Sequence, residues 1–239
     1  MISAEDAKKI IESAKEYWRA QVNLPEFRAI FKGKEVGHRI ADYVDEHTTA
    51  MLKEKFTTKY EVDAKGKPRA RSMGDIWFYS DGGYHPINVK AGESGKNGQP
   101  NMVSLTKLLD RLMKHEIDSY YLLIVKMSFE VDEDGVPTSV TPNIYFVDML
   151  DYLDYITFDA GPGQTMLREK QFYEAIDGGV NRKALSLSEK VVRLTELLED
   201  GDRRLIENRR KKMERIRKDV ENYNGLGSHD LNQGGLELG

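Results

Sequence analysis

The chain has 239 residues, of which 39 % are hydrophobic and 32 % charged, with a formal net charge of −4. This length is enough for one large domain with a substantial core, and the lack of cysteine excludes disulfides and thiolate metal sites. No segment approaches the roughly 18 apolar residues that cross a bilayer, and the charged N-terminus has no secretory signal core. We therefore expect a cytoplasmic protein with no membrane association.

Apolar spacing and turn residues predict helices and strands in alternation. The predicted helices cover residues 4–20, 33–52, 102–115, 167–176 and 186–223, the last with a candidate break at Asp200–Gly201. The predicted strands cover residues 56–62, 75–79, 85–91, 119–131 and 139–149, and residues 92–101 and 158–166 are predicted as glycine-rich loops. This pattern favours an α/β or α+β fold with a mixed central β-sheet flanked by helices and a long C-terminal helix. We expect one domain over residues 1–225 and a flexible tail over residues 226–239.

A predicted β-hairpin carries the clearest chemical pattern. If the turn is centred on Gly82–Gly83, facing residues have numbers that add up to about 165, and Asp75 lies opposite Lys90. Asn88 is two positions before Lys90 and shares its face of the strand. We expect these three polar side chains to converge on one patch.

A carboxylate, an amide and the carbonyl between them are ligands that a hard cation such as Mg²⁺ accepts. Asp75, Asn88 and the Val89 carbonyl supply such a set, and Lys90 is suited to orient an attacking water and offset charge on phosphorus. The implied chemistry is phosphodiester hydrolysis. An ordinary cross-strand ion pair between Asp75 and Lys90 fits the same spacing, and these residues alone leave both interpretations open.

In this region the chain resembles the type II restriction endonucleases, whose signature is an acid on one strand and acid-x-lysine on the next (PD-D/E-x-K). The matching residues are Gly74-Asp75 and Asn88-Val89-Lys90, with Gly74 where proline is frequent and Asn88 where an acid is usual. The order of elements over residues 30–130 also resembles the blunt-cutting enzymes of this class, and the basic C-terminal helix is a looser match. The resemblance implies a restriction-endonuclease-like fold in which Asp75, Asn88 and Val89 bind a metal ion. Lys90 would orient and activate the attacking water. It also implies a role for Glu35, because the preceding helix often lends a carboxylate to the metal.

Other residues are candidates for binding DNA. Amide and lysine side chains match base edges. We therefore expect a DNA-binding role for the loop residues Ser94, Lys96, Asn97, Gln99 and Asn101. Gln164 and Arg168, in a second segment, are candidates for the same role. A solvated loop has the same composition, so this assignment stays a hypothesis. Residues 203–218 hold nine cations and two acids, a net charge of +7, which is suited to phosphate contacts.

The sequence thus predicts a Mg²⁺-dependent endonuclease for double-stranded DNA. A palindromic site cut on both strands favours a homodimer, in which each subunit serves one strand. Two alternatives remain open. One is a repair or recombination nuclease such as a junction resolvase, and the other is a DNA-binding protein without catalytic activity.

Overall fold

The computed structural model describes residues 1–29, 36–62, 65–67, 72–95, 98–131, 133, 137–179 and 185–230. A five-stranded sheet lies at the centre, in the order β1-β2-β3-β5-β6. Its strands are β1 (Thr58–Lys59), β2 (Ile76–Ser80), β3 (Gly83–Glu93), β5 (Tyr121–Val131) and β6 (Pro137–Asp148). β3 and β5 are parallel and the other neighbours are antiparallel. The expected mixed central sheet is therefore confirmed.

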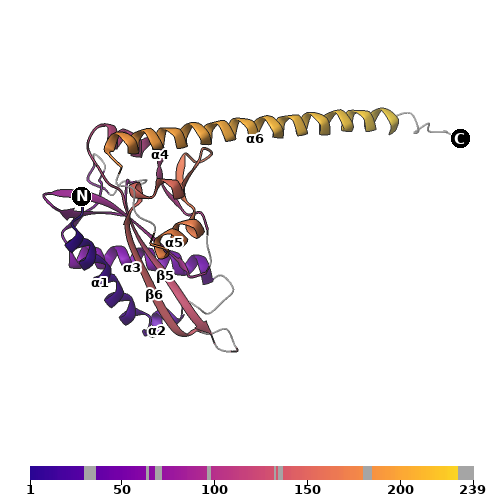
Figure 1. The fold of residues 1–239 in the computed structure, drawn as a ribbon. Coiled ribbons are helices and arrows are strands. Elements are labelled where there is room, and N and C mark those ends of the chain that lie inside the picture. Colours follow the sequence, from indigo (N-terminus) through magenta and orange to yellow (C-terminus); the bar gives the residue numbers. More distant parts are fainter. Residues whose placement is uncertain are drawn as a thin grey trace.

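Two helices cover one face of this sheet (Figure 1). They are α1 (Ala4–Gln21) and α3 (Val36–Lys55), with the short α2 (Pro25–Ala29) between them. Apolar residues at helical spacing, such as Ile10 and Leu52, pack against Ile87 and Val89 of β3. Because successive residues of a strand point to opposite faces of the sheet, the neighbours of Ile87 and Val89 point to the other face.

The opposite face packs against a second sheet and three helices. This sheet has the order β4-β8-β7, formed by β4 (Asn101–Ser104), β7 (Ile156–Asp159) and β8 (Gln164–Leu167). The helices are α4 (Leu105–Met113), α5 (Glu169–Asp177) and α6 (Leu187–Asp230), and two 3₁₀ turns, η1 (Met149–Asp151) and η2 (Leu153–Tyr155), precede β7. The largest apolar cluster fills the space between these layers.

The sequence-based prediction missed the second sheet. Residues 101–104 form a strand and not the start of a helix, and most of the predicted loop 158–166 belongs to β7 and β8. These strands have four residues each, too few for an alternating pattern to stand out. Their pairing depends on distant contacts, such as the buried hydrogen bond from Thr165 Oγ1 to the Val103 carbonyl oxygen (3.0 Å).

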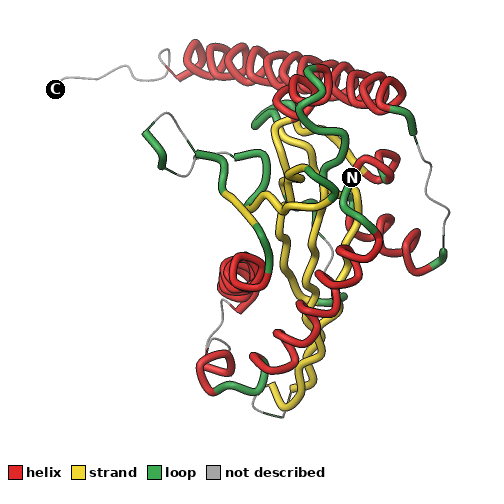
Figure 2. Tube along the Cα trace, turned by 90° about the vertical axis from the view of Figure 1, so that its left-hand side faces the viewer, coloured by secondary structure: helices red, strands yellow, loops and turns green. Residues whose placement is uncertain are grey.

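The C-terminal helix α6 is continuous through Gly201, where a break was predicted. Gly201 is buried, and a Cβ there would overlap the ring of Phe158 on β7. The glycine therefore permits close packing and does not end the helix. α6 then leaves the body and projects away from it (Figures 1 and 2). Its assigned helix runs to Asp230, into the predicted tail, and residues 231–239 lie outside the described ranges.

Within the described ranges, no helix combines the length and the apolar character that a bilayer crossing requires.

Candidate active site at the open edge of strand β3

The hairpin between β2 and β3 sets the position of Asp75. Its turn residues are Asp81 and Gly82, both with positive φ (46° and 78°), as a two-residue type I′ turn requires. Facing residues therefore have numbers that add up to 163, as in the pair Ile76–Ile87. The expected value of about 165, which set Asp75 opposite Lys90, is wrong. Asp75 lies level with Asn88, and its Oδ2 accepts a hydrogen bond from the Val89 backbone N–H (2.7 Å).

Gly74 is required by the close approach of this segment to β3. A Cβ at Gly74 would lie 2.7 Å from the Ile87 carbonyl oxygen, which is backbone and has little freedom to move. The glycine at the position where the signature often has proline is therefore explained by packing. It brings the exposed carboxylate of Asp75 to the edge of β3.

Asn88 is held in the core by its amide nitrogen. Nδ2 donates to the Tyr120 hydroxyl (3.0 Å) and to the Met102 carbonyl (3.3 Å), and burial raises the pKa of that tyrosine. Oδ1 of Asn88 is buried and has no hydrogen-bond partner among the described residues. This side chain thus retains an acceptor, although most of its contacts are structural.

Lys90 shares the face of Asn88, because the two residues are two positions apart on β3. Asp75 immediately precedes β2 and adds to the raised pKa of Tyr120, the hydroxyl partner of Asn88. Asp75 and Lys90, both described, form no ion pair within 4 Å. The simple ion pair is therefore not formed, and the convergence of the three side chains on one patch stays a prediction.

A second acidic residue of this region was missed by the sequence-based prediction. Asp45 on α3 interacts electrostatically with both Lys90 and Asp75, and α3 packs against β3. Residue 45 lies between the buried Val44 and Thr48, on the inner flank of the helix. Local spacing offers no signal for this acid, because its place beside β3 depends on how α3 packs. Glu35, predicted for this role, lies outside the described residues.

The Asp45 carboxyl group is strongly perturbed. Burial raises its pKa to about 7, Lys90 opposes this shift, and Asp75 and Asp42 add to it. One oxygen, Oδ1, is buried without a hydrogen-bond partner in the described part of the chain. A buried, unpaired carboxyl oxygen next to a second acid and a lysine is typical of functional sites.

The backbone of β3 adds a further oxygen. β2 begins at Ile76, which pairs with Ile87, and in the described structure no strand pairs with this side of β3 beyond Ile87. The N–H of Val89 points to this open edge, where it meets Asp75. Because the N–H and C=O of one strand residue point to the same side, the Val89 carbonyl lies at this edge too.

A buried ion pair ties this site to the predicted recognition loop. Lys126 of β5 is level with Gly92, two residues past Lys90, and its Nζ lies 2.8 Å from Oε1 of Glu169. Oε2 of Glu169 accepts a hydrogen bond from the Gly98 backbone N–H (2.7 Å). Gly92 leaves room for the lysine, since a Cβ there would lie 3.1 Å from Nζ.

The structure brings some of the predicted DNA-binding residues together. Asn101 pairs with Met166, and the Leu167 N–H bonds to the Pro100 carbonyl (3.2 Å), so Gln99 and Asn101 lie beside Arg168. These three side chains are exposed. Gln164 lies at the far end of β8, level with Ser104.

Of the remaining loop candidates, Ser94 lies within the described residues, and it stands apart from this group. Ser94 is joined to the edge of the central sheet through Asn143, while Lys96 and Asn97 lie outside the described residues. Glu93 falls on the opposite face of β3 from Lys90 by strand alternation.

No protein-family model matches the chain, and no curated protein matches it. The geometry of Asp45, Asp75, Val89 and Lys90 therefore carries the functional argument.

Proposed function

We propose that this chain is a Mg²⁺-dependent endonuclease that hydrolyses phosphodiester bonds in double-stranded DNA at a specific sequence. The observation that carries the proposal is the gathering of Asp45, Asp75 and Lys90 at the open edge of β3. Two carboxylates and a lysine at a strand edge can hold a cation, a phosphate and a water in one place.

The available donors fit a hard divalent cation. Asp75 would hold it with its exposed carboxylate, Asp45 with the unpaired Oδ1 and Val89 with its carbonyl oxygen. Among the described residues, no three His, Cys, Asp or Glu side chains form a metal-holding group, so water and phosphate oxygens would complete the shell, as is common for Mg²⁺. When bound, the cation would supply Lewis-acid stabilisation of the phosphate.

Lys90 is placed to act on the attacking water. Its ammonium group makes no hydrogen bond or ion pair with the side chains that the structure describes, so its three donors are available. Held near the phosphate, it would orient the water and stabilise the charge that develops on the phosphoryl oxygens.

DNA recognition is proposed for the surface around Gln99, Asn101 and Arg168. Amide side chains read adenine edges and arginine reads guanine. The Lys126–Glu169 pair and the Gly98 contact fix this surface relative to β3. We further propose a homodimer, because two subunits related by a two-fold axis can each cut one strand of a palindromic site.

The test is digestion of phage DNA with Mg²⁺ by the parent protein and by Asp75→Asn and Lys90→Ala variants. We expect discrete fragments from the parent and a loss of about 100-fold or more in rate from each substitution. Asp110→Asn and Lys114→Ala, which alter an exposed acid and lysine of α4, are matched controls and should cut normally.

Other results would contradict the proposal in distinct ways. A smear, or preference for branched DNA, would indicate a resolvase-type nuclease. Binding without cutting would indicate a DNA-binding protein, and full activity of Lys90→Ala would remove the mechanism.

A further inference from the structure

The projecting part of α6 exposes apolar side chains on one line. From Ile206 to Tyr223 every described side chain is exposed. Six of the twelve large apolar side chains that are exposed in the described structure lie on α6: Val192, Ile206, Met213, Ile216, Val220 and Tyr223. Residues 192, 199, 206, 213 and 220 follow a seven-residue repeat, and four of these five are apolar. This repeat is typical of a helix that packs along another helix.

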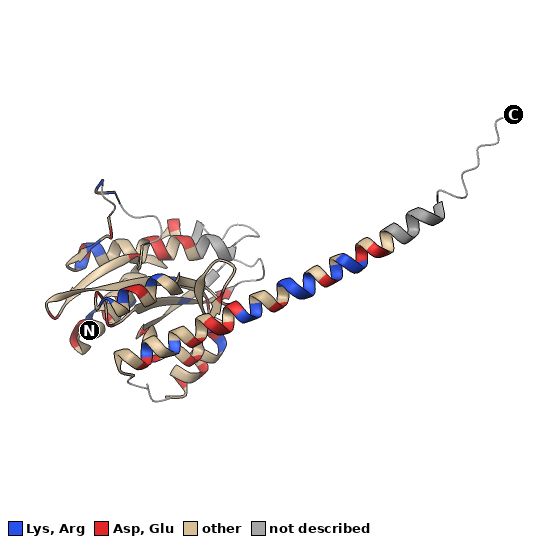
Figure 3. Ribbon diagram, turned by 90° about the horizontal axis from the view of Figure 1, so that it is seen from above, with Lys and Arg blue, Asp and Glu red and all other residues tan. Residues whose placement is uncertain are grey.

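Charge is strongly segregated along the same helix (Figure 3). We define the root as residues 187–202 and the arm as residues 203–223. The root carries five acids and two cations, a net charge of −3, while the arm carries nine cations and four acids, a net charge of +5. The root packs on the body through residues such as Leu194. The arm therefore extends a positive, partly apolar helix into solvent.

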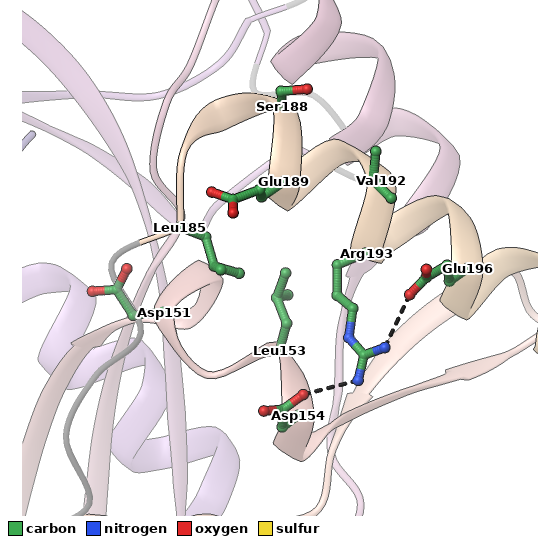
Figure 4. Close-up of a pocket in the computed structure, with 9 residues that line it drawn as sticks. All are labelled: Asp151, Leu153, Asp154, Leu185, Ser188, Glu189, Val192, Arg193 and Glu196. Carbon is green, nitrogen blue, oxygen red and sulfur yellow. Dashed lines mark hydrogen bonds and ion pairs between the residues drawn. The ribbon is translucent and has the colours of Figure 1, made fainter.

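A negative cavity borders the exposed side of the root (Figure 4). It has a volume of about 450 Å³ between α6 and the turns η1 and η2. Its charged residues are four acids and one arginine: Asp151, Asp154, Glu189, Glu196 and Arg193. Arg193 already pairs with Asp154 and Glu196 (2.9 Å each), which leaves the cavity with excess negative charge. Val192, 56 % exposed, lies at its rim.

We propose that two copies of this chain pair through α6, antiparallel, so that the arm of each lies on the root of the other. If residues whose numbers add up to about 408 face each other, Val192 meets the partner's Ile216 and Glu199 meets the partner's Arg209. On the flank, Glu196 lies beside the partner's Arg210. A two-fold axis repeats each of these contacts.

Charge complementarity selects a second copy over other occupants. The negative root and the positive arm are on the same helix, so an antiparallel pair neutralises both without any other partner. Direct pairing of arm with arm would instead set Arg210 against the partner's Arg217. An exposed helix of this length is also only marginally stable in water, because most helical stability comes from packing.

The test is sedimentation velocity of the full-length protein without DNA, using reversed charges. The parent is expected to be a dimer. Root reversal (Glu196→Lys with Glu199→Lys) and arm reversal (Arg209→Glu with Arg210→Glu) should each weaken dimerisation at least tenfold. An equimolar mixture of the two variants should form a heterodimer, because each reversed root then meets a complementary arm.

Arg215→Glu with Lys218→Glu is the matched control, since it makes the same charge change on the outer side of the arm. It should leave dimerisation unchanged, and circular dichroism should show equal helix content in all variants. A monomeric parent, or variants that do not recover in the mixture, would overturn the proposal. If arm reversal lowers DNA affinity with no change in mass, the arm is a phosphate-binding surface instead. These outcomes do not depend on whether the protein cuts DNA.

Discussion

At the scale of single residues, Asp45 of the proposed site combines a raised pKa with a buried carboxyl oxygen that has no hydrogen-bond partner among the described residues. Asp75 and Lys90 could be chosen because an acid and a lysine in adjacent strands are unusual within apolar runs. Asp45 was missed because an acid in a helix is ordinary. Its position becomes informative only when α3 is known to pack against β3. The tertiary contact that makes it unusual is not encoded in local spacing.

The perturbed Asp45 carboxyl predicts a pH-dependent stability in metal-free buffer. Because burial raises its folded pKa to about 7 from the ordinary value of 3.8, the folded protein retains, between these pH values, a proton that the unfolded chain has lost. The free energy of unfolding should then decrease as pH rises from about 4 to about 7. Asp45→Asn should flatten this decrease and be more stable than the parent at pH 8 by about 1 to 3 kcal/mol.

Urea denaturation at several pH values in the presence of EDTA measures this difference. Glu46→Gln serves as the control and should follow the parent, because Glu46 is an exposed acid of the same helix and does not contribute to the shift of the Asp45 pKa. Parallel curves for the parent and Asp45→Asn would contradict the assignment of Asp45 as a buried, perturbed acid.

Gly74 gives a second prediction at this scale. Gly74→Ala should destabilise the protein by about 2 to 4 kcal/mol and reduce cleavage, because the added Cβ must displace Asp75 or β3. Gly83→Ala is the control, since a Cβ there would meet only the His85 ring at 3.8 Å. Chemical denaturation measures both, and equal stability of the two variants would show that the tight approach at Gly74 is absent.

At the scale of elements, long periodic segments were predicted well and short ones were not. β5, β6 and the helices α1, α3 and α6 match their predicted ranges closely, because each has many apolar positions on one face. The second sheet was missed, since its register is set by contacts between residues about 60 positions apart, such as Val103 and Thr165. The turn Asp81–Gly82 was misplaced by one residue, which was enough to move Asp75 from Lys90 to Asn88.

The ion pair between β5 and α5 supports a prediction about how these elements are joined. Lys126→Met should destabilise the protein by about 3 to 5 kcal/mol, because it leaves Glu169 charged and buried. Adding Glu169→Leu should restore most of this stability and still impair DNA cleavage, since Gly98 loses its acceptor. Thermal unfolding and cleavage rates separate the two effects.

An exposed pair of equal length provides the control. Lys114 and Asp110 are also 2.8 Å apart, but their side chains are 58 % and 51 % exposed. Lys114→Met should therefore lower the free energy of unfolding by less than about 1 kcal/mol. If Lys126→Met and Lys114→Met lose a similar amount of stability, burial of the Lys126–Glu169 pair has no energetic consequence.

At the scale of the whole molecule, the body and the projecting helix have different roles. The body positions the proposed site through α3, β3 and the second sheet, and α6 joins it through the root. Lys190 of the root lies 3.7 Å from the buried Asp148, whose pKa burial raises to about 6. Beyond Leu205, the described side chains of the arm are all exposed up to Tyr223 and add nothing to this core. The proposed dimer would give the arm a partner, and it would supply the second cleavage site that a double-strand cut needs.

Truncation after Leu205 separates these roles. Because every described side chain from Ile206 to Tyr223 is exposed, removing them should leave the unfolding temperature within about 2 °C of that of the monomeric root-reversal variant. The truncated protein should sediment as a monomer. On supercoiled plasmid it should accumulate nicked circles before linear DNA, since one subunit would cut one strand at a time. Root reversal in the full-length chain should give the same nicking pattern with the arm intact, which distinguishes lost pairing from lost arm charge. A truncated protein that remains a dimer, or that linearises plasmid as directly as the parent, would show that the two active sites are brought together by another surface.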